Sequence, residues 1–115
     1  MTREQILDRY KGFVYNLSTH EGGKANSFLL HMILGIVTEA GELADAVKHV
    51  VGYNQMLDQK NVKEEMGDLL FYMQGVCNFY GWEINELMVE NMEKLNERYP
   101  SGWTQKDAID RKDKK

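Results

Sequence analysis

The feature that most limits the folds open to this chain is the spacing of its apolar residues. They recur every three or four positions through most of the sequence, which is the period of a helix buried on one face. No stretch alternates apolar and polar residues cleanly enough to indicate a strand. The pattern predicts four helices, over about residues 2–17, 27–51, 61–79 and 85–98.

Short connections between amphipathic helices are typical of an all-α bundle. The 115 residues are enough for one domain and not for two. We therefore expect a single all-α, four-helix-bundle-type domain over residues 1–103 and a polar, flexible tail over residues 104–115. A helical domain this small often gains apolar core by pairing with a copy of itself, so a homodimer or a homotetramer built as a dimer of dimers is expected.

Several helix ends carry signals of their own. Thr2 and Gln5 have the spacing of a capping box at the start of the first helix. Gly52 and Gly81 follow the second and third helices, where a glycine often ends a helix in the left-handed conformation. The single cysteine, Cys77, lies in an apolar run and is interpreted as a small buried hydrophobe.

The formal net charge of −4 argues against a nucleic-acid backbone as partner, although it leaves room for a free nucleotide. The N-terminal stretch MTREQILDRY is charged and helical, unlike a secretory signal. We also expect no membrane span, because no apolar stretch is expected to approach the ~20 residues that a span needs. The chain is therefore expected to be cytoplasmic, with neither nucleic acid nor membrane as a partner.

Acidic residues interrupt the apolar face of two of the predicted helices. Glu39 falls in the apolar stripe of the second helix, and Glu42 lies one turn further on. The third helix repeats the arrangement, with Glu65 in the apolar series and Asp68 one turn later. The chain thus contains an ExxE pair followed by an ExxD pair on the next helix.

A helix–loop–helix of this length folds back on itself, so the two carboxylate pairs can face each other. Ionised carboxylates gathered in a partly apolar setting repel one another and are poorly hydrated. A divalent cation removes that cost, and oxygen-only ligands suit Mg²⁺, with Mn²⁺ as an alternative. We therefore predict a metal site formed by Glu39, Glu42, Glu65 and Asp68, whose open positions take phosphate oxygens.

Two other interpretations of the acids were weighed. A single ExxE pair on a helix is usually part of a solvent-exposed face. A di-iron bundle would need a glutamate with a histidine three residues later, and no such pair occurs in the chain. His20, His31 and His49 are also poorly spaced for that chemistry, and His31 is interpreted as a packing residue.

Three segments resemble a known family. They are GIVTEAGELADAVK, EEMGDLLFYM and NMEKLNERYPSGW, and they are similar to the MazG-like family of all-α nucleoside triphosphate pyrophosphohydrolases. The hallmark of that family is ExxE on one helix and ExxD on the next, and the resemblance covers roughly residues 28–103. It implies Mg²⁺-dependent hydrolysis of an NTP or dNTP between the α- and β-phosphates, giving a nucleoside monophosphate and pyrophosphate. It also implies a dimer or tetramer whose site can draw residues from more than one chain.

The third of these segments is taken to bind the substrate. Lys94 and Arg98 lie one turn apart on the fourth predicted helix and would donate to phosphate oxygens. Asn91, one turn before Lys94, would hydrogen-bond a phosphate or the sugar, and Tyr99 completes the set that the resemblance implies.

Glu42 is the first candidate, and Glu39 the second, for a general base that takes a proton from the attacking water. A competing, non-enzymatic hypothesis is a nucleotide- or metal-sensing helical module that binds without turnover, and the intact set of acids argues against it.

Base recognition needs aromatic side chains in an apolar slot. The candidates are Phe28, Phe71, Tyr72, Tyr99 and Trp103.

Overall fold

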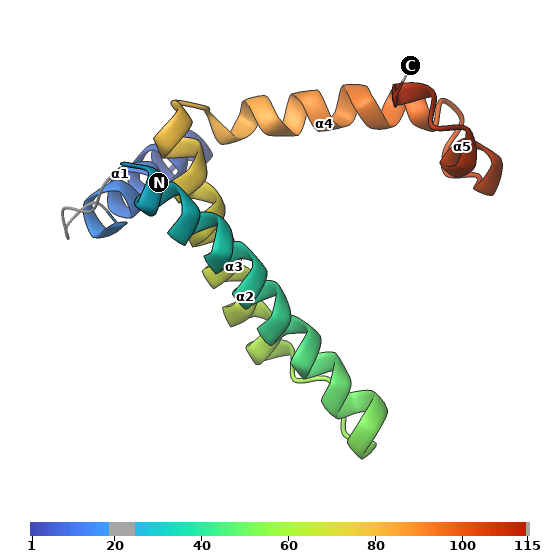
Figure 1. Ribbon diagram of the computed structural model, residues 1–115, viewed down its shortest axis with the longest axis horizontal. Coiled ribbons are helices and arrows are strands. Elements are labelled where there is room, and N and C mark those ends of the chain that lie inside the picture. The colour runs from blue at the N-terminus through green and yellow to red at the C-terminus, as the bar shows by residue number, and fades with distance from the viewer. Residues whose placement is uncertain (19–24, 115) are drawn as a thin grey trace. The chain divides into compact units, whose positions relative to one another are not determined.

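The computed structural model describes residues 1–18 and 25–114, and these are almost entirely helical (Figure 1). The helices are α1 (Arg3–Ser18), α2 (Ala25–Tyr53), α3 (Gln59–Tyr80), α4 (Ile84–Arg98) and α5 (Gln105–Asp110), followed by the 3-10 helix η1 (Lys112–Lys114). Within these described ranges there is no strand, and the bridge between Pro100 and Gly102 is isolated. The expected all-α class is confirmed.

The chain divides into two compact units, Met1–Gly81 and Trp82–Lys115. The first unit contains α1, α2 and α3, and the second contains α4, α5 and η1. The division at Gly81 falls inside the single domain that the sequence predicts over residues 1–103, and the extent of that domain stays a prediction.

In the first unit, α2 and α3 lie side by side as an antiparallel pair (Figure 1). A short link of residues 54–58 joins them, and Asn54 has a φ of 52°, a left-handed conformation that asparagine tolerates. Asp58 caps α3 by accepting two backbone N–H groups of its first turn, at 3.1 and 3.2 Å. Gly52 was expected to end α2, but it lies inside the helix because Asn54 makes the turn instead.

The two helices pack against each other where glycines leave room for large side chains. A Cβ atom at Gly35 of α2 would overlap the ring of Tyr72 on α3, and one at Gly75 of α3 would overlap Sδ of Met32 on α2. Met32 is only 3% exposed, and Cys77 is 2% exposed, so the interpretation of this cysteine as a buried hydrophobe is confirmed. The pair is therefore held in register by side chains that fill the space left by glycines.

α1 is fixed to α3 by a buried polar contact and an apolar one. The side-chain amide of Asn78 donates to the backbone carbonyl of Lys11 at 3.0 Å. The amide of Gln74, itself buried, donates to Oδ1 of Asn78 at 3.0 Å and orients it. Val14 of α1 is fully buried. These contacts anchor α1 along α3.

Two predicted helix ends are confirmed. The backbone N–H of Thr2 donates to Oε1 of Gln5 at 2.9 Å, and the N–H of Gln5 donates to Oγ1 of Thr2 at 3.1 Å, which is the reciprocal pattern of a capping box. Gly81 ends α3 with a φ of 73°, a conformation that glycine adopts at little cost.

In the second unit, the stretch expected to be a polar flexible tail contains α5 and η1. Thr104 caps α5 by accepting the backbone N–H of Asp107 at 3.1 Å. The carboxylate of Asp113 is fully buried and accepts two hydrogen bonds from Arg98 at the end of α4, at 2.8 and 2.9 Å. This ion pair joins the polar stretch to α4.

α2 is long and apolar enough to cross a membrane by length and composition alone. Over Ser27–Tyr53 the mean hydropathy is 1.3, which corrects the expectation that no stretch is apolar enough. The core helix of a soluble protein passes the same test, and Glu39 and Glu42 near its middle would be costly in lipid. Only 11% of the apolar window is buried in this chain, so most of this surface is open to further contacts.

Candidate functional site

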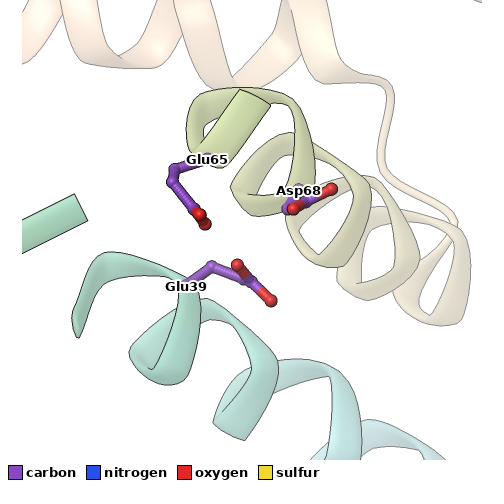
Figure 2. A group of neighbouring side chains, drawn as sticks. All are labelled: Glu39, Glu65 and Asp68. Atoms are coloured by element: carbon purple, nitrogen blue, oxygen red, sulfur yellow. The ribbon is translucent and has the colours of Figure 1, made fainter. Parts of the chain in front are cut away.

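Three carboxylates from α2 and α3 converge where the two helices face each other. Glu39 points across from α2 toward Glu65 and Asp68 on α3 (Figure 2). One oxygen of each residue lies within 4.8 Å of the others. Glu39 and Glu65 are half-buried, whereas Asp68 is exposed. We call these three residues the carboxylate group.

The close helix approach at Gly35 positions the carboxylate group. Glu39 lies one helical turn after Gly35 on α2, and Asp68 lies one turn before Tyr72 on α3. The ring of Tyr72 fills the space over Gly35, so this contact between the two helices lies one turn from the acids on each of them. Packing between the two helices therefore holds like charges near one another.

The environment of Glu65 is unfavourable for its charge. Its Oε2 atom is buried and has no hydrogen-bond partner among the residues that the structure describes. While both acids are ionised, Glu39 cannot donate to Glu65, but a proton on either acid allows a hydrogen bond between them. That bond is the main cause that raises the pKa of Glu65, and burial and the negative charges of Glu39, Asp68 and Glu64 add to it. Without a cation, the carboxylate group is thus a site of electrostatic repulsion.

This repulsion predicts a pH dependence of stability in metal-free buffer. The folded chain retains a proton on Glu65 that the unfolded chain has already released, so the contribution of Glu65 to stability is present below its ordinary pKa of 4.5 and is lost as the pH rises through the raised value. Thermal unfolding in EDTA at a series of pH values should show the wild type losing stability relative to Glu65→Gln over this window. The exposed neighbour variant Glu64→Gln should follow the wild type closely, because the charge of Glu64 is the smallest of the causes that raise the pKa of Glu65. Parallel curves for all three proteins would contradict the assignment of this pH dependence to Glu65.

The structure places the other predicted acid, Glu42, outside the carboxylate group. Three residues turn an α-helix by about 300°, so Glu42 lies about 60° from Glu39 around the axis of α2. Glu42 is exposed, and it is not among the described acids whose oxygens lie within 4.8 Å of one another. Its assignment as a metal ligand or general base stays a prediction.

The histidines take no part in the carboxylate group. The ring of His31 lies edge-on to Tyr72, at 6.1 Å between centroids, as a packing residue would. His49 approaches Asp45, with Nε2 and Oδ2 3.5 Å apart on an exposed surface. His20 lies outside the described residues.

A hollow of about 470 Å³ opens beside the carboxylate group. Glu39 and Asp68 line it, so two of the three acids face this space. α3 also contributes Phe71 and Tyr72, whose rings meet edge to face at 5.2 Å between centroids. Gly67 forms part of its floor, and a Cβ atom there would meet nothing within 4 Å. The hollow therefore has an acidic end and an aromatic side.

α1 forms the remaining wall of the hollow. This wall consists of Tyr10, Phe13 and Leu17. Burial, and to a lesser extent the charge of Asp68, raises the pKa of Tyr10, so its phenol keeps its proton and remains a hydrogen-bond donor at neutral pH. We call Tyr10, Phe13 and Leu17 the α1 wall.

Sequence reasoning missed the α1 wall as part of a site. Tyr10 and Leu17 fit the apolar period of the first helix, and Phe13 was not singled out. The spacing of the two aromatic residues, one turn apart on one helix, was the available signal. Of the predicted base-recognition candidates, Phe71 and Tyr72 line the hollow, whereas Phe28 stacks on Phe79 at 6.2 Å between centroids.

The predicted substrate-binding residues belong to the second unit. Asn91 and Lys94 are exposed on α4. The guanidinium of Arg98 is bound by Asp113 and lies over the ring of Tyr99, 5.6 Å from its centroid. The hydrogen bonds from Arg98 hold the pKa of the Asp113 carboxyl well below its usual range. The roles of these four residues toward a substrate stay predictions.

The donor set of the carboxylate group fits a hard divalent cation. All its ligand atoms are carboxylate oxygens, which Mg²⁺ and Mn²⁺ accept and which softer metals favour less. The buried Oε2 of Glu65 would gain from a cation the partner it otherwise lacks. The arrangement can therefore hold a metal at the acidic end of an aromatic hollow.

Comparisons with known proteins agree with this chemistry. Residues 29–103 match the family model described as the MazG nucleotide pyrophosphohydrolase domain. The chain is 33% identical over 81 residues to the uncharacterized protein YpjD of Bacillus subtilis, covering 68% of this chain and 73% of YpjD. It is 27% identical over 81 residues to the Gene 37 protein of Mycobacterium phage L5, covering 67% and 71% of the two chains. No solved structure matches the chain significantly.

Proposed function

Because the chain belongs to the family of MazG nucleotide pyrophosphohydrolase domains, we propose that it hydrolyses an NTP or dNTP between the α- and β-phosphates. The products are a nucleoside monophosphate and pyrophosphate. The observation that carries the proposal is the carboxylate group, in which three acids from adjacent helices converge within 4.8 Å and one buried oxygen lacks a partner. Such a group is stable when ionised only with a cation nearby.

Glu39, Glu65 and Asp68 are the residues that would hold Mg²⁺, with Mn²⁺ as a substitute. When bound, the metal neutralises the triphosphate and lowers the pKa of a coordinated water. The half-buried positions of Glu39 and Glu65 keep bulk water away from two of the three ligands. The exposed position of Asp68 leaves the group open on the side of the hollow, where a phosphate can enter.

Glu42 is proposed as the general base, with Glu39 as the second candidate. Glu42 lies one turn from Glu39 but outside the carboxylate group, so its oxygens are not committed to the cation and can accept a proton from water. Glu39, by contrast, is a member of the group, and its lone pairs would be shared with the ion.

Asn91, Lys94, Arg98 and Tyr99 are proposed to contact the substrate. Lys94 is exposed and carries a mobile ammonium that suits a phosphate. Asp113 fixes the orientation of Arg98 by two hydrogen bonds, so this cation is presented in one geometry.

We also propose that the chain is a cytoplasmic homodimer or homotetramer built from helix bundles. The support is the exposed apolar surface of α2, where Leu34, Val37 and Val51 are 61%, 63% and 81% exposed. Apolar side chains that share a helix face at these exposures are typical of a surface that packs against another helix.

A panel of the common NTPs and dNTPs, incubated with Mg²⁺, tests the activity. We expect at least one nucleotide to give equal amounts of nucleoside monophosphate and pyrophosphate, resolved by chromatography. EDTA should abolish the reaction, and Mn²⁺ should restore part of it. Release of inorganic phosphate with a nucleoside diphosphate would contradict cleavage at the α–β bond, and tight binding without any product would favour the sensor hypothesis.

A further inference from the structure

The α1 wall is largely apolar, and two of its three side chains are exposed although it borders an acidic site. Phe13 and Leu17 are 58% and 59% exposed. Their helix is nevertheless fixed to α3, because Val14 is fully buried and Asn78 is bonded to the backbone of Lys11. An apolar surface on a well-anchored helix beside a binding hollow needs an occupant to cover it.

The shape and chemistry of the hollow narrow the choice of occupant. Its volume of about 470 Å³ lies within the usual range for small-ligand pockets, about 300–1,000 Å³. Glu39 and Asp68 line one part, and the other lining residues are aromatic rings from α1 and α3 together with Leu17 and Gly67. An occupant that fits both parts has a charged, metal-binding end and a flat, apolar end. A metal-bound nucleotide has this composition.

We infer that the α1 wall, with Phe13 and Tyr10 as its principal contacts, binds the base and sugar of the nucleotide and sets which nucleotides the site accepts. This inference rests on the proposed function, since it assigns the nucleoside end of the same substrate. The wall lies before the segment that matches the family model, residues 29–103. The catalytic acids and the specificity surface therefore come from different parts of the chain.

Phe13 and Tyr10 would make different contacts with the nucleotide. Phe13 has no polar atom, so it offers a base only a flat apolar surface. Tyr10 offers a similar ring and also a phenol that donates a hydrogen bond near Asp68, where the sugar would lie between base and phosphates. Tyr72, which also lines the hollow, is already committed to packing over Gly35, so the α1 wall is the part of the hollow that can vary without disturbing the helix pair.

Equilibrium binding measurements can distinguish contacts to the nucleoside end of the ligand from contacts to its phosphate end. The ligands are the non-hydrolysable α,β-methylene analogues of dATP and dCTP, and inorganic triphosphate, each titrated with Mg²⁺ in a calorimeter. Phe13→Ala should weaken at least one nucleotide analogue about 5- to 100-fold, the range found when a base loses an aromatic partner. The same variant should change the affinity for inorganic triphosphate less than about twofold, because that ligand has no base.

Tyr15→Ala is the matched control. Tyr15 lies on the same helix with nearly the same exposure, 57%, but does not line the hollow. This variant should bind all three ligands as the wild type does. The inference would be overturned if Phe13→Ala weakened the affinity for triphosphate and for the nucleotide analogues equally, or changed none of these affinities. A change in oligomeric state with unchanged ligand selectivity would also overturn it, since the wall would then be covered by a second copy.

Filling the hollow gives a second, independent test. Gly67→Leu adds a side chain where a Cβ meets no atom within 4 Å, so the backbone can accept it while the space for the nucleoside shrinks. Nucleotide affinity should fall at least about tenfold, with triphosphate affinity retained. Gly41→Leu, at an equally open glycine outside the hollow, should have no such effect. Wild-type binding of nucleotide without pyrophosphate release would refute the proposed activity, whereas turnover with unaltered selectivity in both Phe13→Ala and Gly67→Leu would refute this inference alone.

Discussion

Glu39→Gln is expected to lower Mg²⁺-dependent pyrophosphate release by at least about 100-fold, because loss of even an indirect metal partner commonly costs 10- to 100-fold. The same substitution should raise the thermal stability of the metal-free protein. It removes one negative charge from the carboxylate group and gives Glu65, whose Oε2 lacks a partner, a neighbouring amide that can donate. Activity and metal-free stability should thus change in opposite directions, which simple misfolding cannot produce.

Two measurements check this expectation. Pyrophosphate release reports the activity, and thermal unfolding with and without Mg²⁺ reports the metal. The wild type should gain stability on adding Mg²⁺, because the ion binds only the folded chain, and Glu39→Gln should gain little. Glu42→Gln distinguishes a ligand from a base: it should keep the Mg²⁺-induced stabilisation and lose about 100- to 10,000-fold in rate. If Glu42→Gln also lost the response to Mg²⁺, Glu42 would be a ligand and the general base would have to be sought elsewhere.

Gly35→Ala should destabilise the first unit by about 1–3 kcal/mol, the usual cost of forcing an extra group into a packed helix interface. The new methyl group would overlap the ring of Tyr72 near its attachment to the backbone, where the side chain has little freedom to move away. The helices would have to separate one turn from Glu39, so activity should fall together with stability. Chemical denaturation followed by circular dichroism measures the first effect, and pyrophosphate release the second.

Gly41→Ala is the control on the same helix. A Cβ atom at Gly41 meets nothing within 4 Å, so alanine there should only improve helix propensity, by up to about 1 kcal/mol. Opposite signs for the two alanines would show that the loss at Gly35 arises from packing against α3. If both glycine variants were stabilised, the close contact between Gly35 and Tyr72 would not exist in solution.

Much of the local structure follows from short-range rules. Apolar residues at helical spacing located α1 to α4 to within a few residues, because one buried face is enough to specify a helix. The capping box of Thr2 and Gln5 was readable because both partners lie within one turn. The prediction at Gly81 was right and the one at Gly52 was wrong. A glycine permits a positive φ, but the path of the following chain decides which residue adopts it, and after α2 that residue is Asn54.

Short-range sequence patterns predicted only part of the candidate site. Helical phase alone placed Glu39, Glu65 and Asp68 toward a shared interface, and these three do converge. It could not separate Glu42 from them, because a difference of about 60° around one helix matters only once the position of the facing helix is known. That position depends on the contact between Gly35 and Tyr72, residues 37 positions apart in the chain.

The sequence by itself thus determined the helices, the acids and the likeness to a family, since each depends on neighbours along the chain. Only the tertiary structure decided which carboxylates lie close enough to share a cation. It also buries Oε2 of Glu65 without a partner and places Phe13 of α1 and Asp68 of α3 around the same hollow. The physical reason is that charge repulsion, burial and cavity shape depend on distances between segments, and packing sets those distances.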